Sequence, residues 1–358
     1  MPADQARIGA LGAGVRHALI AVRDAEDEFK TQLVGVGLNR CQQLGSASSS
    51  EYGPVITPIH GKVVQMACGR EHSALLIERP DGSRRVAMCG SNAFGQLGFD
   101  ILPTNGTFAR LQKFSVTELD SLNDVLGAGE QPVKVQCGLD HTVILTSNGR
   151  AFAMGWGADG QLGAGPESND SFDRPVMVSG LGGTSLVDIS SSTDFTLALT
   201  AERRLYYWGN AEYGQCMTGT KIDQVLAPIQ IPFDYGLVAG IAAGGSHALV
   251  LTDAGQVYSC GYGALGLGAK AFAALQPELI RGLRDIAAIF ASTDRCLAID
   301  THQQVYSWGL GNAAGRLGNG TAGANAFEPE LLDMTACSLA VDSAMVALGN
   351  DIALVALR

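Results

Sequence analysis

The sequence lacks several features that would assign a chemistry or a membrane location. It has no C-x-x-C pair, none of its eight Cys lies beside a His in metal-ligand spacing, and no G-x-x-x-x-G-K-[ST] loop is present. Neither a zinc site nor a phosphate-binding P-loop is therefore expected. No apolar run reaches about 18 residues, which disfavours a transmembrane segment. The first residues, MPADQARIGALGAG, show neither a secretory signal nor a convincing transit peptide.

Charge and helical periodicity are also scarce. Only 16% of the 358 residues are charged, and the formal net charge is −11. An acidic surface repels phosphate backbones, so we expect no direct binding of DNA. No segment shows a sustained apolar period of 3.6 residues, so helices should be few. The Cys residues that precede Gly at the end of apolar runs are interpreted as small buried hydrophobes.

Glycine, in contrast, is abundant, with 46 residues spread along the chain. Gly-rich turns recur at 37–45, 90–98, 155–163, 209–217, 261–268 and 309–318. Their regular recurrence is typical of an array of supersecondary units. The stretches Gly155–Gly160 and Gly261–Gly266 also match G-x-G-x-x-G literally. Because no strand-to-helix step follows either of them, we interpret both as turns and not as a dinucleotide site.

A second element precedes each Gly-rich turn: an apolar run, a small residue, often Gly, two variable residues and a marked position that is often His. The marked position holds His17, His72, His141, Phe195, His247 and Arg295 in successive copies. A degraded seventh copy begins at Cys337 and continues with expected strands at Ala344–Leu348 and Ile352–Leu357. Short polar turns such as Ser147-Asn148-Gly149 separate two apolar runs in a copy, which predicts hairpins. Six or seven such units close most economically as a β-propeller.

The two elements together, roughly C-G-x-x-H-[ST]-x-x-L-T…G-x-[VL]-[YF]-x-W-G-x-x-x-x-G-Q-L-G, resemble the repeat of the regulator of chromosome condensation family from Ala13 to Leu357. The resemblance implies an all-β fold, a seven-bladed β-propeller of four-stranded blades, in one domain over residues 1–358. The last blade lacks its Gly-rich motif; either it is incomplete or a segment before residue 1 completes it, and we expect the second. Stretches such as GVGLNRCQQLG and YYWGNAEYGQ are most similar to the mitochondrial branch, which implies a mitochondrial location.

The residue before the marked position suggests a binding face. This position holds Arg16, Glu71, Asp140, Asp194, Ser246 and Asp294. Blade symmetry puts equivalent turns on one face, where carboxylates would form a negative ring that steers a basic partner. Alternatively, each acid accepts a local backbone N–H, and the two interpretations are compatible. In the family's founding member such turns face a small GTPase, so the resemblance implies partner binding at Glu71, Asp140, Asp194, His247 and Asp294.

Other candidate groups suggest no chemistry. The repeated His residues are interpreted as structural, each with a hydrogen bond inside its blade, while His60 and His302 have no evident partner. No catalytic, cofactor or metal site is assigned, and we expect the chain not to be an enzyme. The largest insertion lies between Gly98 and Val133. It is either a partner-specific wedge or a loop without a function, and its candidate wedge residues are Phe108, Arg110, Lys113 and Phe114.

Two functions follow from this interpretation. By resemblance, the chain is an interaction protein that regulates a mitochondrial GTPase as a guanine-nucleotide exchange factor does, by favouring the nucleotide-free partner. The alternative is a scaffold or assembly factor in a mitochondrial complex, such as a ribosome-assembly group, without exchange activity.

Overall fold

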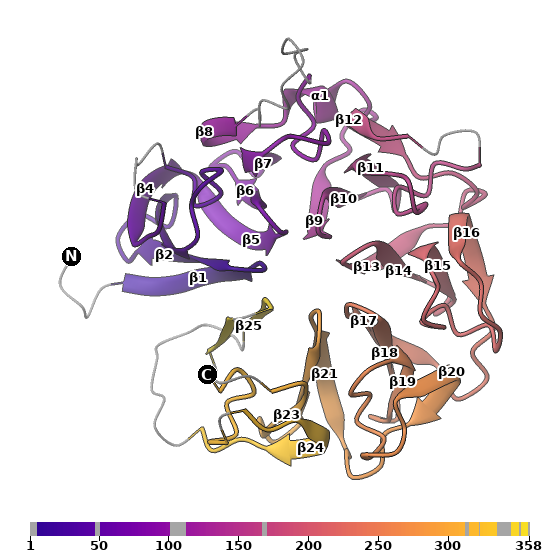
Figure 1. Cartoon of the computed structure of the whole chain (residues 1–358). Helices are drawn as coiled ribbons and strands as arrows, with labels where there is room; N and C mark the ends of the chain where they lie inside the picture. The colour runs from indigo at the N-terminus through magenta and orange to yellow at the C-terminus, as the bar shows by residue number, and fades with distance from the viewer. Residues whose placement is uncertain are drawn as a thin grey trace. The chain divides into compact units, whose positions relative to one another are not determined.

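Antiparallel sheets form nearly all of the regular structure. The computed structural model describes residues 6–46, 51–100, 112–166, 170–311, 315–321, 323–334, 345–350 and 352–356. Within these residues there are six four-stranded sheets and one two-stranded sheet (Figure 1). Strands that follow one another in sequence are neighbours in each sheet, so every repeat folds as a series of hairpins. The predicted all-β class and the repeated hairpins are confirmed.

The chain divides into two compact units, which are described separately. Unit 1 comprises Met1–Ala158, Glu167–Val178 and Leu339–Arg358, and unit 2 comprises Asp159–Pro166 and Ser179–Ser338.

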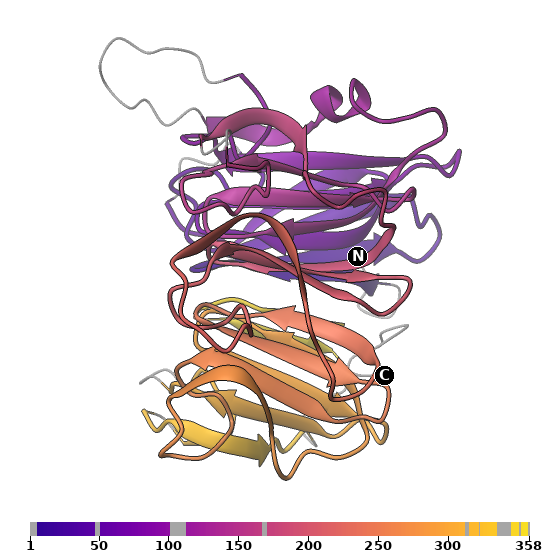
Figure 2. The same cartoon turned by 90° about the vertical axis from the view of Figure 1, so that its right-hand side faces the viewer.

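Unit 1 contains three of the four-stranded sheets and the two-stranded one. The strands of its first sheet are β1 (Ala6–Ala13), β2 (His17–Asp24), β3 (Lys30–Gly37) and β4 (Val55–His60). Those of the second are β5 (Lys62–Cys68), β6 (His72–Glu78), β7 (Arg84–Ser91) and β8 (Gln112–Glu118). Those of the third are β9 (Pro132–Cys137), β10 (His141–Thr146), β11 (Ala151–Gly155) and β12 (Phe172–Met177). The two-stranded sheet, β25 (Met345–Leu348) and β26 (Ala353–Ala356), contacts β1. The short helix α1 (Asp120–Asn123), drawn as a coiled ribbon at the top of Figure 2, contacts β12.

Unit 2 contains the other three four-stranded sheets. The strands of its first sheet are β13 (Leu186–Ser192), β14 (Phe195–Thr200), β15 (Leu205–Asn210) and β16 (Gln224–Ile231). Those of the second are β17 (Val238–Ala243), β18 (His247–Thr252), β19 (Val257–Tyr262) and β20 (Ala273–Leu279). Those of the third are β21 (Ile286–Ala291), β22 (Arg295–Asp300), β23 (Val305–Gly309) and β24 (Ala326–Leu331).

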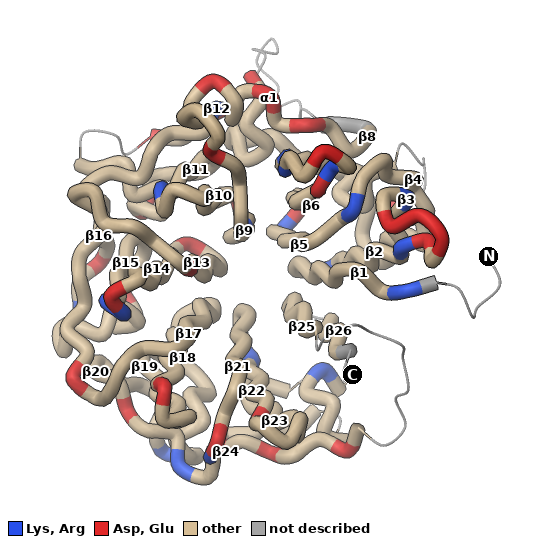
Figure 3. The backbone as a smooth tube through the Cα atoms, turned by 180° about the vertical axis from the view of Figure 1, so that it is seen from behind, with Lys and Arg blue, Asp and Glu red and all other residues tan. Residues whose placement is uncertain are grey.

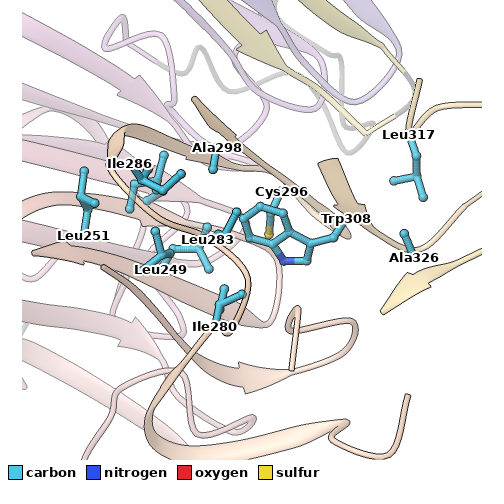
Figure 4. Packing of buried hydrophobic residues seen from close by; sticks show 13 residues of the cluster. Leu249, Leu251, Ile280, Leu283, Ile286, Cys296, Ala298, Trp308, Leu317 and Ala326 are labelled. Carbon is cyan, nitrogen blue, oxygen red and sulfur yellow. The ribbon is translucent and has the colours of Figure 1, made fainter. Parts of the chain in front are cut away.

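The hydrophobic core of each unit lies between successive sheets. First strands pack against each other, β1 with β5 and β5 with β9 in unit 1, and β13 with β17 and β17 with β21 in unit 2. Figure 4 shows one such core in unit 2, where the fully buried Trp308 lies beside Cys296 and Ile280. Second strands such as β10 are buried at every residue, which explains why they read as continuous apolar runs in the sequence.

One backbone hydrogen bond recurs in all six four-stranded sheets. We call the turn between the first and second strands of a sheet its first turn; the Gly-rich turn follows the third strand, at the same end of the sheet. The residue after the first glycine of each Gly-rich turn donates its N–H, over 2.8 Å, to the carbonyl of the residue before the marked position. These donor and acceptor pairs are Leu38 and Arg16, Ser91 and Glu71, Trp156 and Asp140, Asn210 and Asp194, Tyr262 and Ser246, and Leu310 and Asp294.

This turn bond explains why the first glycine recurs. Gly209 has a φ of +106°, a conformation that side chains with a Cβ rarely adopt. A Cβ built on Gly209 would also lie 2.3 Å from the carbonyl oxygen of Asp194, the acceptor of the turn bond. Glycine is thus required both by the backbone conformation and by the close approach of the two turns.

We expect Gly209→Ala to lower the free energy of unfolding by about 3 kcal/mol, because strain and the clash with the Asp194 carbonyl add together. Gly82→Ala is the matched control, since Gly82 also has a positive φ, +78°, but no atom lies within 4 Å of its Cβ position. It should cost about 1 kcal/mol. Urea unfolding of both variants measures the difference, and equal losses would contradict this account.

Candidate partner-binding site

The five predicted partner-binding residues all lie at first turns or directly after them. Glu71 and Asp140 belong to unit 1, and Asp194, His247 and Asp294 belong to unit 2. Within each unit, first turns of successive sheets are hydrogen-bonded to each other. Arg70 N–H donates to the Leu139 carbonyl over 3.0 Å in unit 1, and Gly245 N–H donates to the Thr293 carbonyl over 3.0 Å in unit 2. The structure therefore brings the candidate acids of each unit to one end of its sheets. Figure 3 shows Asp and Glu on the backbone of both units.

The acid in unit 1's third sheet is already paired within the protein. Arg70, from the preceding first turn, forms an ion pair with Asp140. Burial raises the pKa of Asp140, and the neighbouring Arg70 guanidinium opposes that shift. Glu71 accepts a hydrogen bond from the Cys41 thiol, with 3.4 Å between Sγ and Oε2. The negative field expected from these turns is thus partly compensated at Asp140.

The acids in unit 2 also have partners from Gly-rich turns. Gln161 Nε2 donates to Asp194 over 3.3 Å. Arg316, which stands where other copies have the Gln of G-Q-L-G, lies 3.5 Å from the Asp294 carboxylate. Side chains from the Gly-rich turns therefore contact these carboxylates, and the acids remain partly exposed.

The repeated His residues link one sheet to the next, whereas the sequence predicted bonds inside each blade. His17 Nε2 lies 2.8 Å from Ser73 Oγ, and Ser73 Oγ donates to the carbonyl of Gln43 over 2.8 Å. Because that hydroxyl proton goes to the carbonyl, His17 must carry its proton on Nε2 and donate it to Ser73.

The same arrangement repeats in the next sheet. His72 Nε2 lies 3.1 Å from Thr142 Oγ1, which donates to the Gln96 carbonyl over 2.9 Å. In unit 2, His247 Nε2 lies 3.0 Å from Cys296 Sγ in the following sheet. These inter-sheet histidine bonds explain the [ST] that follows His in the repeat pattern, a signal that the sequence already contained.

A glycine three residues before each of these His residues makes room for its ring. A Cβ on Gly69 would lie 2.2 Å from His72 Cε1, and one on Gly244 would lie 2.3 Å from His247 Cε1. In the two copies without His, Ser192 and Ser292 take the place of this glycine. Glycine and histidine thus occur together because the imidazole occupies the volume that a side chain would need.

Burial keeps the repeated imidazoles neutral. Desolvation lowers the pKa of His17 and His247 to about 4, and lowers the pKa of His72 and His141 to about 3. His247 is only 3% exposed. A side chain so buried does not contact a docked partner, so His247 serves the inter-sheet bond and leaves the candidate binding set.

Half of the predicted wedge falls outside the described residues. Phe108 and Arg110 lie there, and nothing of their structure is described. Lys113 and Phe114 are within strand β8, where Lys113 pairs with Gly90 on β7. The insertion therefore contributes an outer strand and the helix α1. The expectation that Lys113 and Phe114 lie in a loop is wrong, because their backbone is part of strand β8.

Other chemistry is not evident in the part of the chain that the structure describes. No group of three or more His, Cys, Asp or Glu side chains there could hold a metal ion. Seven Cys residues in that part are free thiols, six of them buried, and Cys337 lies outside it. No helix among the described residues is long and apolar enough to cross a membrane.

Sequence reasoning missed two features of these turns. The first is the role of the repeated Gln, whose carbonyl oxygen accepts a backbone N–H of its own turn, as Gln96 does from Phe94 over 2.9 Å. The second is a set of exposed aromatic side chains at the same end of the sheets, including Tyr213 and Tyr262. Their irregular occurrence among the copies concealed them, because a repeat consensus discards residues that differ between units.

Six four-stranded meander sheets of one repeat define a member of the β-propeller class. The family model described as the RCC1-like domain matches residues 3–355, and the chain belongs to this family. It is 33% identical over 81% of its length to an RCC1-like G exchanging factor-like protein of Mus musculus, and 31% identical over 88% to that of Homo sapiens. The chain spans 65% of the mouse relative's length and 69% of the human relative's length.

Solved structures agree on the architecture. The crystal structure of human WBSCR16 superposes with a TM-score of 0.85 at 29% identity, covering 99% of this chain and 88% of that one. Yeast RCC1 (Prp20), solved bound to Kap60, superposes with a TM-score of 0.75 at 21% identity, covering 96% of this chain and 78% of that one. The fold is the seven-bladed β-propeller of this family, and the described residues include six four-stranded blades and two strands, β25 and β26, of the seventh.

The buried imidazoles predict a specific loss of stability in acid. An unfolded His binds a proton near pH 6.5, whereas His72 in the fold does so only near pH 3. Between these values the unfolded state holds more protons, so the free energy of unfolding falls as the pH falls. We expect His72→Gln, which retains an Nε2–H donor, to flatten this dependence by about 1.4 kcal/mol per pH unit between pH 6 and 4. Urea unfolding at several pH values measures it, with exposed His302→Gln as the control; identical slopes for parent and His72→Gln would refute the assignment.

Proposed function

We propose that this chain regulates a GTPase in the manner of a guanine-nucleotide exchange factor, and that it acts in mitochondria. The name of the mouse and human relatives, RCC1-like G exchanging factor-like protein, supports the first part. The observation that carries the proposal is the gathering of partly exposed acids at hydrogen-bonded first turns, Glu71 with Asp140 in unit 1 and Asp194 with Asp294 in unit 2.

The mechanism that we propose is one of linkage and involves no covalent step. The acidic turns attract a basic surface of the GTPase and raise its rate of encounter. If the chain binds the nucleotide-free GTPase more tightly than the GDP-bound form, then chain and GDP weaken each other's binding by the same factor. Faster GDP release is the observable consequence. The side chains required are those that contact the partner, and none of them needs to transfer a proton or form a bond.

Release of a fluorescent GDP analogue from purified mitochondrial GTPases tests the proposal. The parent chain should accelerate release from its cognate GTPase, and Asp194→Lys should reduce that acceleration about tenfold or more, because a like charge opposes the basic partner. Asp253→Lys is the matched control: Asp253 is exposed in the turn between β18 and β19, at the opposite end of its sheet from the first turn. It makes the same change in net charge and should leave release unaffected.

The same measurements separate this proposal from a scaffold role in a mitochondrial complex. Unchanged GDP release with every mitochondrial GTPase tested would overturn exchange activity. Co-purification of the chain with ribosomal RNA and assembly factors, together with unchanged release, would favour the assembly scaffold instead.

A further inference from the structure

A row of aromatic side chains crosses the three sheets of unit 2 at the end that carries the first turns. It consists of Tyr213 in the Gly-rich turn after β15, Tyr262 at the end of β19, Phe272 just before β20, and Phe327 in β24. Tyr213 and Tyr262 lie with ring centroids 6.0 Å apart, and Phe272 and Phe327 form an edge-to-face pair at 5.3 Å. Gly263 N–H donates to the Phe272 carbonyl over 2.9 Å, which joins the two pairs. We call these four residues the aromatic row.

Three members of the aromatic row are open to solvent although they are large and mostly apolar, and the fourth, Phe327, is half-buried. Tyr213 is 43% exposed, Tyr262 is 52% exposed and Phe272 is 46% exposed. Single exposed aromatics are ordinary on a protein surface, but two pairs of contacting rings at the same end of three sheets are typical of an interaction site. Aromatic rings are enriched at binding hot spots because they bury a large area at a small cost in conformational entropy.

Acidic residues occur in the chain segments that carry the aromatic row. Glu212 adjoins Tyr213, and the Asp223 carbonyl accepts the N–H of Ala211 over 2.8 Å, which holds Asp223 against the same turn. Glu328 adjoins Phe327, and its Oε1 lies 3.3 Å from the Cβ position of Gly268 in the neighbouring Gly-rich turn. Lys221 and Lys270 are the basic residues of these turns. Tyr262 N–H also donates to the carbonyl of Ser246, in the first turn of the same sheet. In the series of first turns, that of Ser246 comes between those of Asp194 and Asp294.

We propose that the aromatic row is a docking surface for an arginine-bearing segment of a protein partner. A guanidinium stacks on tyrosine and phenylalanine faces and, unlike a lysine ammonium, keeps its donors free for carboxylates at the edge. The rings, together with Glu212, Asp223 and Glu328 in the same chain segments, offer both interactions. A single-stranded nucleic acid would also stack on rings, but it requires a basic groove, and in these segments the three acids outnumber Lys221 and Lys270. The inference deepens the proposed GTPase regulation, on which it rests, by naming the chemistry of the segment that is bound.

Direct peptide binding tests the aromatic row without any GTPase. The probe is a short fluorescein-labelled peptide of alternating Arg and Gly, titrated at near-physiological ionic strength and read by fluorescence anisotropy, beside its Lys counterpart. The Arg peptide should bind the parent chain more tightly than the Lys peptide. The double variant Tyr213→Ala/Tyr262→Ala should weaken Arg-peptide binding about tenfold, because two stacking contacts are removed. Tyr213→Phe/Tyr262→Phe should retain binding, because it keeps both rings.

Tyr235→Ala is the matched control, since Tyr235 is 42% exposed but lies between β16 and β17, at the opposite end of the sheets. It should leave binding unchanged, and circular-dichroism melting confirms the fold of each variant. Equal binding of Arg and Lys peptides, undiminished binding by the double Ala variant, or absence of binding to the parent chain would each overturn the proposal. So would a labelled oligouridine that binds the parent and loses affinity in the double Ala variant. Because the readout contains no nucleotide exchange, failure here leaves GTPase regulation standing, and failure of exchange leaves the docking surface standing.

Discussion

The turn bond between the residue after the first glycine and the residue before the marked position joins the Gly-rich turn to the first turn in every four-stranded sheet. The positions of the candidate binding residues on these turns depend on it. It uses backbone atoms only, so the side chains at its two ends are free to differ between copies. The acceptor position holds residues as different as Arg16 and Asp294, and the donor position holds residues as different as Leu38 and Tyr262. The glycine, in contrast, is fixed by its positive φ and by the approach of the facing carbonyl. A rigid backbone contact thus presents two variable side chains at the end of every four-stranded sheet, the arrangement by which a repeat fold acquires a specific surface.

The inter-sheet histidine bond is a second recurring contact, and in two sheets a residue other than His stands at the marked position. In β14 the marked position is Phe195, which stacks on Tyr207 with centroids 5.3 Å apart. In β22 it is Arg295, which donates to the Arg316 carbonyl. The turn bond is present in both of these sheets. The imidazole therefore contributes to attachment between sheets and to the polarity of their contact, whereas the path of the turn depends on glycine. This explains why the His pattern is interrupted while the glycine pattern is not.

The fold could be predicted from the sequence because local periodicity and turn chemistry specify it. Recurring glycines and apolar runs predicted the hairpins, and the strand expected at Ala344–Leu348 is confirmed over Met345–Leu348 as β25. The site was predicted less well for physical reasons. Spacing locates Asp140 and Asp294 on their turns but does not show that Arg70 and Arg316 reach them, because these contacts join different turns. Burial of His247 likewise depends on the following sheet, and Lys113 and Phe114 became part of an edge strand through pairing with β7.

Side-chain chemistry, and not net charge, distinguishes the turns of the two units. In unit 1, Arg70 lies against Asp140, and the exposed Trp156 packs edge-to-face on Phe94 at 5.0 Å. In unit 2, the exposed rings of Tyr213, Tyr262 and Phe272 come from two sheets, and Phe272 contacts the half-buried Phe327 of the third. A net charge of −11 attracts any basic protein and is screened by salt, so it sets the rate of encounter and not the choice of partner. Selection of one partner over others requires short-range contacts that are lost when a single side chain of the partner does not fit. Exposed rings that can stack with a guanidinium supply such contacts, so unit 2's turns, and not the acidic surface as a whole, are where specificity for the partner should reside.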